Sequence, residues 1–168
     1  MLSVRQALDR VYAGAGFLAG TCIALIAVIV LAQIVGRWFG VIVPSTEDFS
    51  SYLLGSASFL ALSYTFRSGG HIRVTLLINL LSSNCQQRLV HFTLAVFVII
   101  ATYGAYFLGF LVYESWYFHE VSQGYVVVPL WIPQLPMALG SMLLVIALLD
   151  DLVQSLRGKT PAFIRLEE

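Results

Sequence analysis

Two neighbouring acids, Glu47 and Asp48, form the most suggestive pair of chemical groups in this chain. Carboxylates form strong, charge-assisted hydrogen bonds with arginine, and Arg37 lies a short distance upstream. Ser45 and Asp48 also have the spacing of a helix capping box, and acids suit the positive end of a helix dipole. The pair is therefore expected to start a helix, to pair with Arg37, or to contact a partner protein.

A second group follows the next apolar stretch and consists of Arg67, Gly70, His71 and Arg73. Long arginine side chains at the edge of a membrane extend their charged heads to lipid phosphates or to helix ends. We expect Arg67, His71 and Arg73 at such an interface. The alternative is that their positive charge only sets the orientation of the chain.

Other kinds of chemistry have no comparable support in the sequence. The three histidines are far apart, the two cysteines lie in different segments, and no zinc-protease, phosphate-loop or nucleophile-elbow motif occurs. The nine basic and nine acidic residues cancel, so there is no positive excess for nucleic acid. We expect no catalytic site, no metal, no bound cofactor and no nucleic-acid partner.

The elements that position these groups are membrane helices. Hydrophobic residues make up 59% of the chain and charged residues 11%, with a mean hydropathy of +0.87. In soluble domains roughly 45–50% of residues are apolar and about 25% are charged. Four windows lack Asp, Glu, Lys and Arg, and about 17–25 residues suffice to cross ~30 Å of hydrocarbon. The sequence predicts an all-α membrane protein with one domain over residues 1–168. Its four transmembrane helices are expected near residues 12–36, 47–66, 88–113 and 130–149.

The connection between the second and third predicted helices has a helical pattern of its own. Apolar residues recur at spacings typical of one helix face, with polar positions between them: Ile72, Leu76, Leu77, Leu80 and Leu81. This segment is too short to cross a bilayer. A short amphipathic helix near residues 72–83, lying on the membrane surface, is the prediction.

The orientation follows from the distribution of basic residues. All Lys and Arg residues except Arg37 lie before the first helix, around the second connection or after the fourth helix. Basic residues concentrate on the cytoplasmic side of membrane proteins. Both termini and the second connection are therefore expected in the cytoplasm.

Several segments together resemble the small membrane subunit, called DctQ-type, of tripartite ATP-independent periplasmic (TRAP) transporters. They are EDFSSYLL at 47–54, YTFRSGGHIRV at 64–74, AQIVGR at 32–37 and PMALG at 136–140. The family pattern is an acidic pair that opens the second helix, with an arginine, a glycine and an HI-x-V motif after it. Two departures are Pro44-Ser45 in place of an aromatic residue before the pair, and Asp48 in place of a second Glu.

The resemblance implies a specific set of partners. Such subunits lie in the bacterial inner membrane beside a large, DctM-type permease subunit, which holds the substrate and Na⁺ sites and moves as an elevator. The small subunit enlarges its fixed scaffold. A periplasmic DctP-type binding protein delivers the substrate, often an organic acid, and an ion gradient drives uptake. Membrane lipid surrounds the subunits.

Two other functions are open alternatives. A small four-helix transporter that works by itself needs an ionisable residue inside the membrane, and the charge-free windows contain no Asp, Glu, Lys or Arg. A membrane anchor of a redox enzyme needs histidines that face one another to ligate haem.

Overall fold

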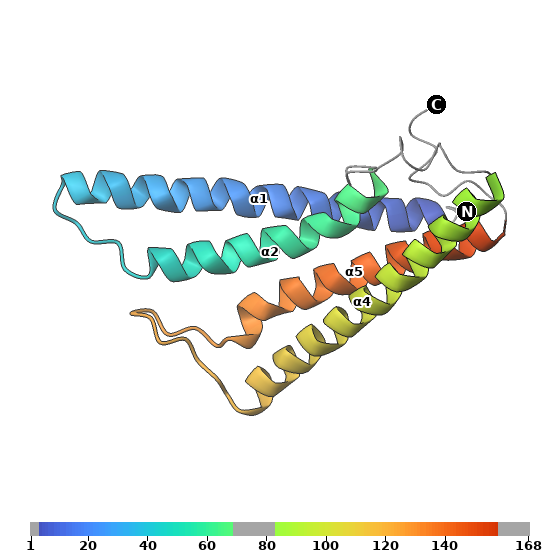
Figure 1. Cartoon of the computed structure of the whole chain (residues 1–168). Coiled ribbons are helices and arrows are strands. Elements are labelled where there is room, and N and C mark those ends of the chain that lie inside the picture. The colour runs from blue at the N-terminus through green and yellow to red at the C-terminus, as the bar shows by residue number, and fades with distance from the viewer. Residues whose placement is uncertain (1–3, 69–82, 158–168) are drawn as a thin grey trace.

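The computed structural model describes residues 4–68 and 83–157, and this part of the chain is helical (Figure 1). The four helices are α1 (Val4–Trp38), α2 (Thr46–Arg67), α4 (Ser83–Tyr117) and α5 (Trp131–Leu156). The only strand-like pairing in these residues is an isolated bridge between Val121 and Pro129. The prediction of an all-α chain is thus confirmed for the described residues.

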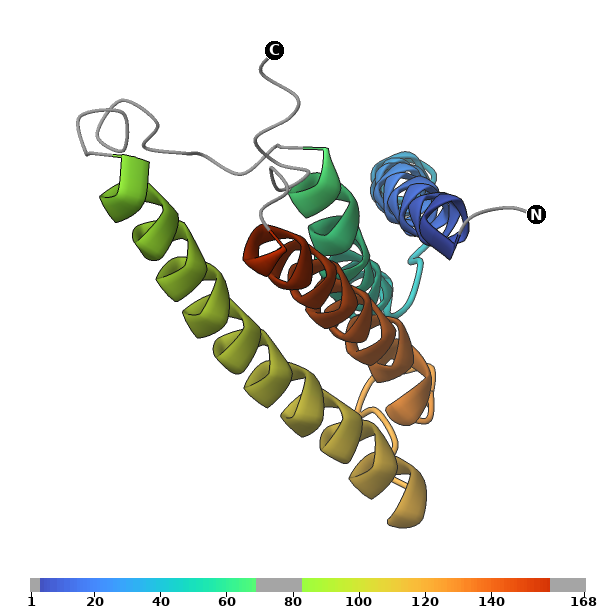
Figure 2. The same ribbon diagram turned by 90° about the vertical axis from the view of Figure 1, so that its right-hand side faces the viewer.

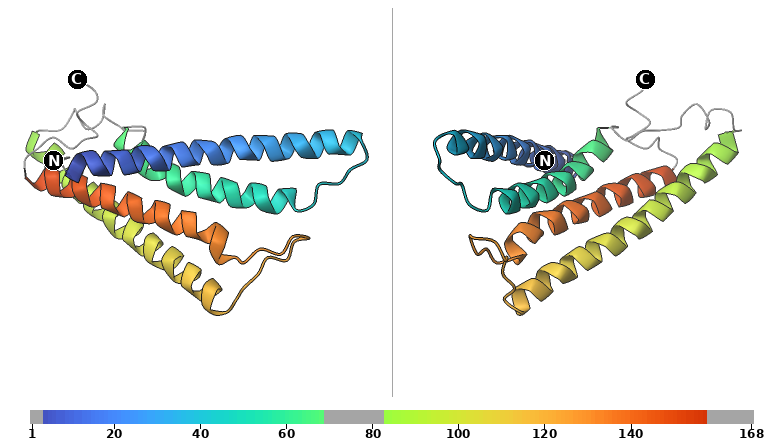
Figure 3. Two further views of the ribbon diagram at one scale, coloured as in Figure 1. Left: turned by 180° about the vertical axis from the view of Figure 1, so that it is seen from behind. Right: turned by 60° about the vertical axis from the view of Figure 1, so that its left-hand side comes forward.

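The helices follow one another in the order α1, α2, α5, α4, each packed on the next (Figure 2). The same order is visible from behind and from the side (Figure 3). The inner helices α2 and α5 each have a helix on both sides, whereas α1 and α4 are the outer helices. The outer helices therefore keep wide apolar faces that no other described element covers.

Three of the helices, α1, α4 and α5, extend beyond the predicted spans, and α5 continues past residue 149 to Leu156. α1 and α4 each contain 35 residues, because the helical backbone continues past the charged residues that bounded the apolar windows. The predicted surface helix near residues 72–83 lies outside the described residues except for Ser83, which begins α4. Gly70, His71 and Arg73 lie outside them as well.

Small residues let α1 and α2 approach each other. Ala15 and Ala19 are buried against Leu60, and a Cβ atom added to Gly16 would lie 2.7 Å from the Tyr64 ring. Gly20, by contrast, has no neighbouring atom within 4 Å of such a Cβ. Close van der Waals contact of this kind drives helix association in membranes.

The α2–α5 contact is closer still. A Cβ atom added to Gly140 would lie 2.5 Å from the Phe59 carbonyl oxygen and 2.7 Å from the Leu60 nitrogen. These are backbone atoms, so no side-chain rotation can relieve the contact. The absence of a side chain at Gly140 therefore sets the distance between the two inner helices.

Three helices contain segments long and apolar enough to cross a membrane: Gln6–Trp38, Gln87–Tyr117 and Trp131–Leu156. α2, which the sequence analysis counted as a fourth span, is not among them. It is richer in hydroxyl side chains, and the Ser56 and Ser58 hydroxyls donate to the carbonyl oxygens of Tyr52 and Leu54. Because α2 lies between α1 and α5, its surface is matched to protein neighbours more than to lipid.

Candidate functional site

The candidate residues found in the sequence lie at opposite ends of the molecule. Arg37 ends α1, and Glu47 and Asp48 open α2, so these three lie at one end of the helices. Arg67 ends α2 at the other. The structure therefore has two separate charged regions, with apolar helix between them.

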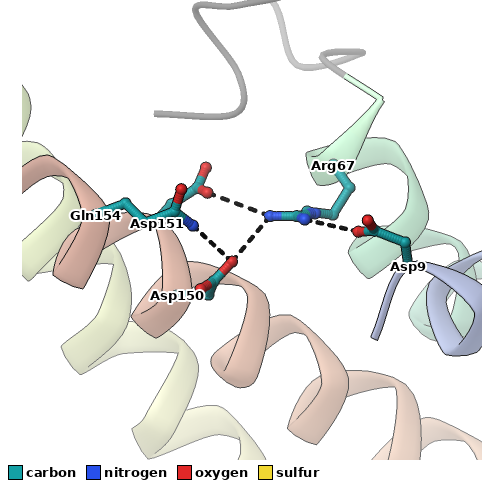
Figure 4. Close-up of polar contacts among 5 residues, drawn as sticks. All are labelled: Asp9, Arg67, Asp150, Asp151 and Gln154. Atoms are coloured by element: carbon teal, nitrogen blue, oxygen red, sulfur yellow. Dashed lines mark hydrogen bonds and ion pairs between the residues drawn. The ribbon is translucent and has the colours of Figure 1, made fainter. Parts of the chain in front are cut away.

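Arg67 is the centre of the larger region (Figure 4). Its Nη2 atom lies 2.6 Å from Asp9 Oδ1, on α1. Its Nη1 atom lies 3.1 Å from Asp150 Oδ2 and 3.4 Å from Asp151 Oδ1, both on α5. One guanidinium group thus joins the ends of three helices.

Two further side chains complete this group, which we call the Arg67 cluster: Asp9, Tyr12, Arg67, Asp150, Asp151 and Gln154. The guanidinium carbon lies 5.6 Å from the centre of the buried Tyr12 ring, within the range of a cation–π contact. The Gln154 amide donates a hydrogen bond of 2.8 Å to Asp150 Oδ2.

Burial determines how much each of these ion pairs contributes to stability. The Arg67 side chain is 12% exposed and Asp151 is 1% exposed, whereas Asp9 is 54% exposed. An exposed ion pair contributes little, but a buried charge that loses its partner is strongly destabilising. The contact with α5 therefore dominates the energetics, and the Asp9 pair adds a weaker connection to α1.

Arginine suits this position better than lysine would. Its planar guanidinium group presents five N–H donors in a fixed fork, so one side chain can donate to carboxylates on two sides at once. The cluster contains three carboxylates and one arginine at the helix ends. This geometry connects the ends of α1, α2 and α5.

At the opposite end, the segment between α4 and α5 folds back as a hairpin. The Ser122 N–H donates to the Val128 carbonyl, and the Val128 N–H donates to the Ser122 hydroxyl. Glu120 accepts a hydrogen bond of 2.8 Å from the Ser115 hydroxyl. These bonds give the hairpin a defined shape beside the start of α2.

The predicted capping box at Ser45 and Asp48 is wrong. Ser45 has a left-handed backbone (φ 55°), and its side chain makes no capping hydrogen bond to α2. Its hydroxyl instead accepts a bond of 3.0 Å from the Val126 N–H, in the hairpin. The serine that precedes α2 therefore binds the hairpin, which is distant in the sequence.

Asp48 also faces the hairpin, because a Cβ atom added to Gly124 would meet its carboxylate. Glu47 and Arg37 are exposed. Within the described residues, Arg37 forms no ion pair with either acid, so the expected pairing is not found. The contact of these charges with a partner protein stays a prediction.

The acidic members of the Arg67 cluster were not predicted from the sequence. A signal was nevertheless present, since Asp9 precedes the first apolar window and Asp150 and Asp151 follow the last. Four antiparallel helices bring those points to the same end as Arg67. Complementary charges at one end of a helical membrane protein are candidates for ion pairs.

The family comparison agrees with the fold. The family model described as "Tripartite ATP-independent periplasmic transporters, DctQ component" matches residues 26–158. This range includes the C-terminal part of α1 and all of α2, α4 and α5. No curated protein and no solved structure matches the chain significantly. Because the match extends over most of its length, the chain belongs to the DctQ family and is a small permease component of a TRAP transporter.

Proposed function

We propose that this chain enlarges the fixed scaffold of a DctM-type large subunit, which moves as an elevator. A DctP-type periplasmic protein delivers a small solute, of which an organic acid is the expected class. Uptake is driven by an ion gradient, with Na⁺ bound by the large subunit. The chain itself contributes structure and no chemistry.

The observation that carries this proposal is the arrangement of its helices. They form an open row, so the outer helices α1 and α4 have apolar faces that no other described helix covers. The charged groups gather at the helix ends, and the Arg67 cluster is engaged in holding helices together. A polar solute needs polar groups within the membrane to cross it, and a second protein must supply them.

We also propose that α2 is a fourth membrane span and that both termini lie in the cytoplasm of a bacterium, with the chain in its inner membrane. Support for the fourth span comes from the position of α2, which packs between α1 and α5, two helices long and apolar enough to cross a membrane. Hydroxyl groups bonded to the helix backbone are tolerated in such a setting. The Arg67 cluster then lies on the cytoplasmic side and the hairpin on the periplasmic side.

Thiol labelling tests this orientation. In a chain that has Cys22 and Cys85 replaced by alanine, a cysteine at Gln123, exposed in the hairpin, is expected to react with an impermeant maleimide in spheroplasts. A cysteine at Ala7, exposed near the start of α1, is expected to react only after permeabilisation. The reverse pattern would contradict the orientation. Reaction of both cysteines without permeabilisation would contradict α2 as a span, because the two positions would then lie on the same side of the membrane.

Reconstitution tests the proposed role. Liposomes containing this chain alone, with an inward Na⁺ gradient, are expected to take up none of the radiolabelled organic acids that the cognate binding protein retains. Liposomes that also contain the large subunit, supplied with the binding protein, are expected to take them up. Omission of this chain from the complete system is the matched control and is expected to abolish uptake. Saturable uptake by the chain alone would instead support a small transporter that works by itself.

A further inference from the structure

The outward face of α4 has an unusual composition. Its exposed residues recur at alternating intervals of four and three, which is the spacing of a helix–helix seam: Ile99, Tyr103, Tyr106, Phe110, Tyr113 and Tyr117. Ala105 and Leu94 are buried instead, as α4 packs on α5. Figure 2 shows α4 at the edge of the row, so none of the other described helices covers the seam.

Two residues of this seam lie deep within the apolar part of α4. At 1.5 Å per residue, Tyr103 and Tyr106 are about 16 Å and about 12 Å along the axis from Glu114, and both are more than ~20 Å from Arg88. Each is 67% exposed, and neither hydroxyl has a hydrogen-bond partner among the described residues. Leaving a hydroxyl group without a partner in hydrocarbon is costly.

An aromatic belt does not explain these two tyrosines. Tyr and Trp gather where hydrocarbon meets headgroups, and Tyr113, Trp116 and Tyr117 near the end of α4 fit that description. Tyr103 and Tyr106 lie about two to four turns deeper, beyond the reach of a phenol to the headgroups. Their exposure therefore indicates a protein neighbour that has hydrogen-bond acceptors.

The outward face of α1 provides the contrast. Its exposed residues in the middle of the helix are aliphatic: Ile23, Leu25, Val28, Leu31 and Ile34. The exposed Thr21 hydroxyl donates to the Phe17 carbonyl oxygen, at 2.9 Å, so it needs no outside partner. This face is suited to lipid.

We infer that the α4 seam, centred on Tyr103 and Tyr106, is the surface on which the large permease subunit packs, while the outer face of α1 faces lipid. The inference rests on the proposed function. The large subunit contributes a transmembrane helix with small residues and with side-chain or backbone acceptors for the two hydroxyls. A second copy is a poorer match, because two copies in the same orientation bring identical bulky rings to the same level and keep the helices apart.

Photo-crosslinking in the assembled complex tests this placement. The chain is co-expressed with the large subunit and carries p-benzoylphenylalanine at Tyr106, or at Val28 on α1 as the matched control. A crosslink to the large subunit is expected from position 106 and not from position 28. A crosslink from 28 alone, or from 106 to a second copy of this chain, would overturn the inference.

The hydroxyls themselves are tested by replacing both tyrosines with phenylalanine, which keeps the rings. Tyr103→Phe combined with Tyr106→Phe is expected to weaken the complex by about three- to tenfold in a detergent-dissociation assay. Tyr125→Phe, in the hairpin and outside the seam, is expected to leave it unchanged. Equal retention of the double variant and wild type would contradict the inference.

Failure of the proposed function has a different signature. If the wild-type chain does not co-purify with the large subunit, the proposed function is wrong. If it co-purifies, but position 106 gives no crosslink to the large subunit and the double phenylalanine variant dissociates like wild type, only the assignment of the α4 seam is wrong.

Discussion

Arg67→Ala is expected to lower the free energy of unfolding by about 3–5 kcal/mol, the range found when one partner of a buried ion pair is removed. The substitution leaves Asp151, which is 1% exposed, beside Asp150 without the guanidinium that offsets their charge. It also removes the contact with the Tyr12 ring. The measurement is unfolding in mixed micelles by SDS titration, followed by tryptophan fluorescence.

Arg10→Ala is the matched control for this prediction. Arg10 lies at the same end of the molecule, is exposed and forms no ion pair in the described residues. Both substitutions remove one positive charge from the side expected to be cytoplasmic, so a purely topogenic role predicts equal effects. Arg67→Lys is expected to restore only part of the stability, because an ammonium group lacks the planar fork. Equal stability of Arg67→Ala and Arg10→Ala would contradict the structural role of the cluster.

Gly140→Ala is expected to lower the free energy of unfolding by about 1–3 kcal/mol, as overpacking does in a well-packed core. The added methyl group would lie 2.5 Å from the Phe59 carbonyl oxygen, so α2 and α5 must move apart. Gly140→Leu is expected to be worse and to prevent recovery of a monodisperse protein. The measurement for the alanine variant is the same SDS titration.

Gly20→Ala is the control, because a Cβ atom there meets nothing within 4 Å. Alanine has a higher helix propensity than glycine, so this variant is expected to be neutral or more stable by about 0.5–1 kcal/mol. If the two alanine variants had the same stability, the close approach of α2 and α5 would not be a determinant of this fold.

Several features of this chain are determined by the sequence alone. The spacing of charged residues predicts where helices lie, because a run without charges and of sufficient length has to satisfy its backbone hydrogen bonds internally in a membrane. Motifs at 32–37, 47–54, 64–74 and 136–140 were sufficient to suggest the family that the comparison then confirmed. The surface helix near residues 72–83 stays a prediction.

Local patterns were less reliable at the ends of helices. The spacing of Ser45 and Asp48 predicted a capping box, yet the Ser45 hydroxyl binds Val126, which is far away in the chain. The predicted spans are shorter than the helices α1 and α4, because the charged residues that bound an apolar window do not interrupt a helix. Such ends depend on competing partners and not on composition.

The arrangement of the helices was decided only by the tertiary structure. Chain order does not reveal that α5 packs between α2 and α4, and this placement brings Asp150 and Asp151 to Arg67. It also gives Gly140 its close contact with the α2 backbone and leaves the tyrosines of α4 uncovered. The physical reason is that hydrophobicity and helix length act within one segment, whereas ion pairs and close helix contacts depend on which segments become neighbours.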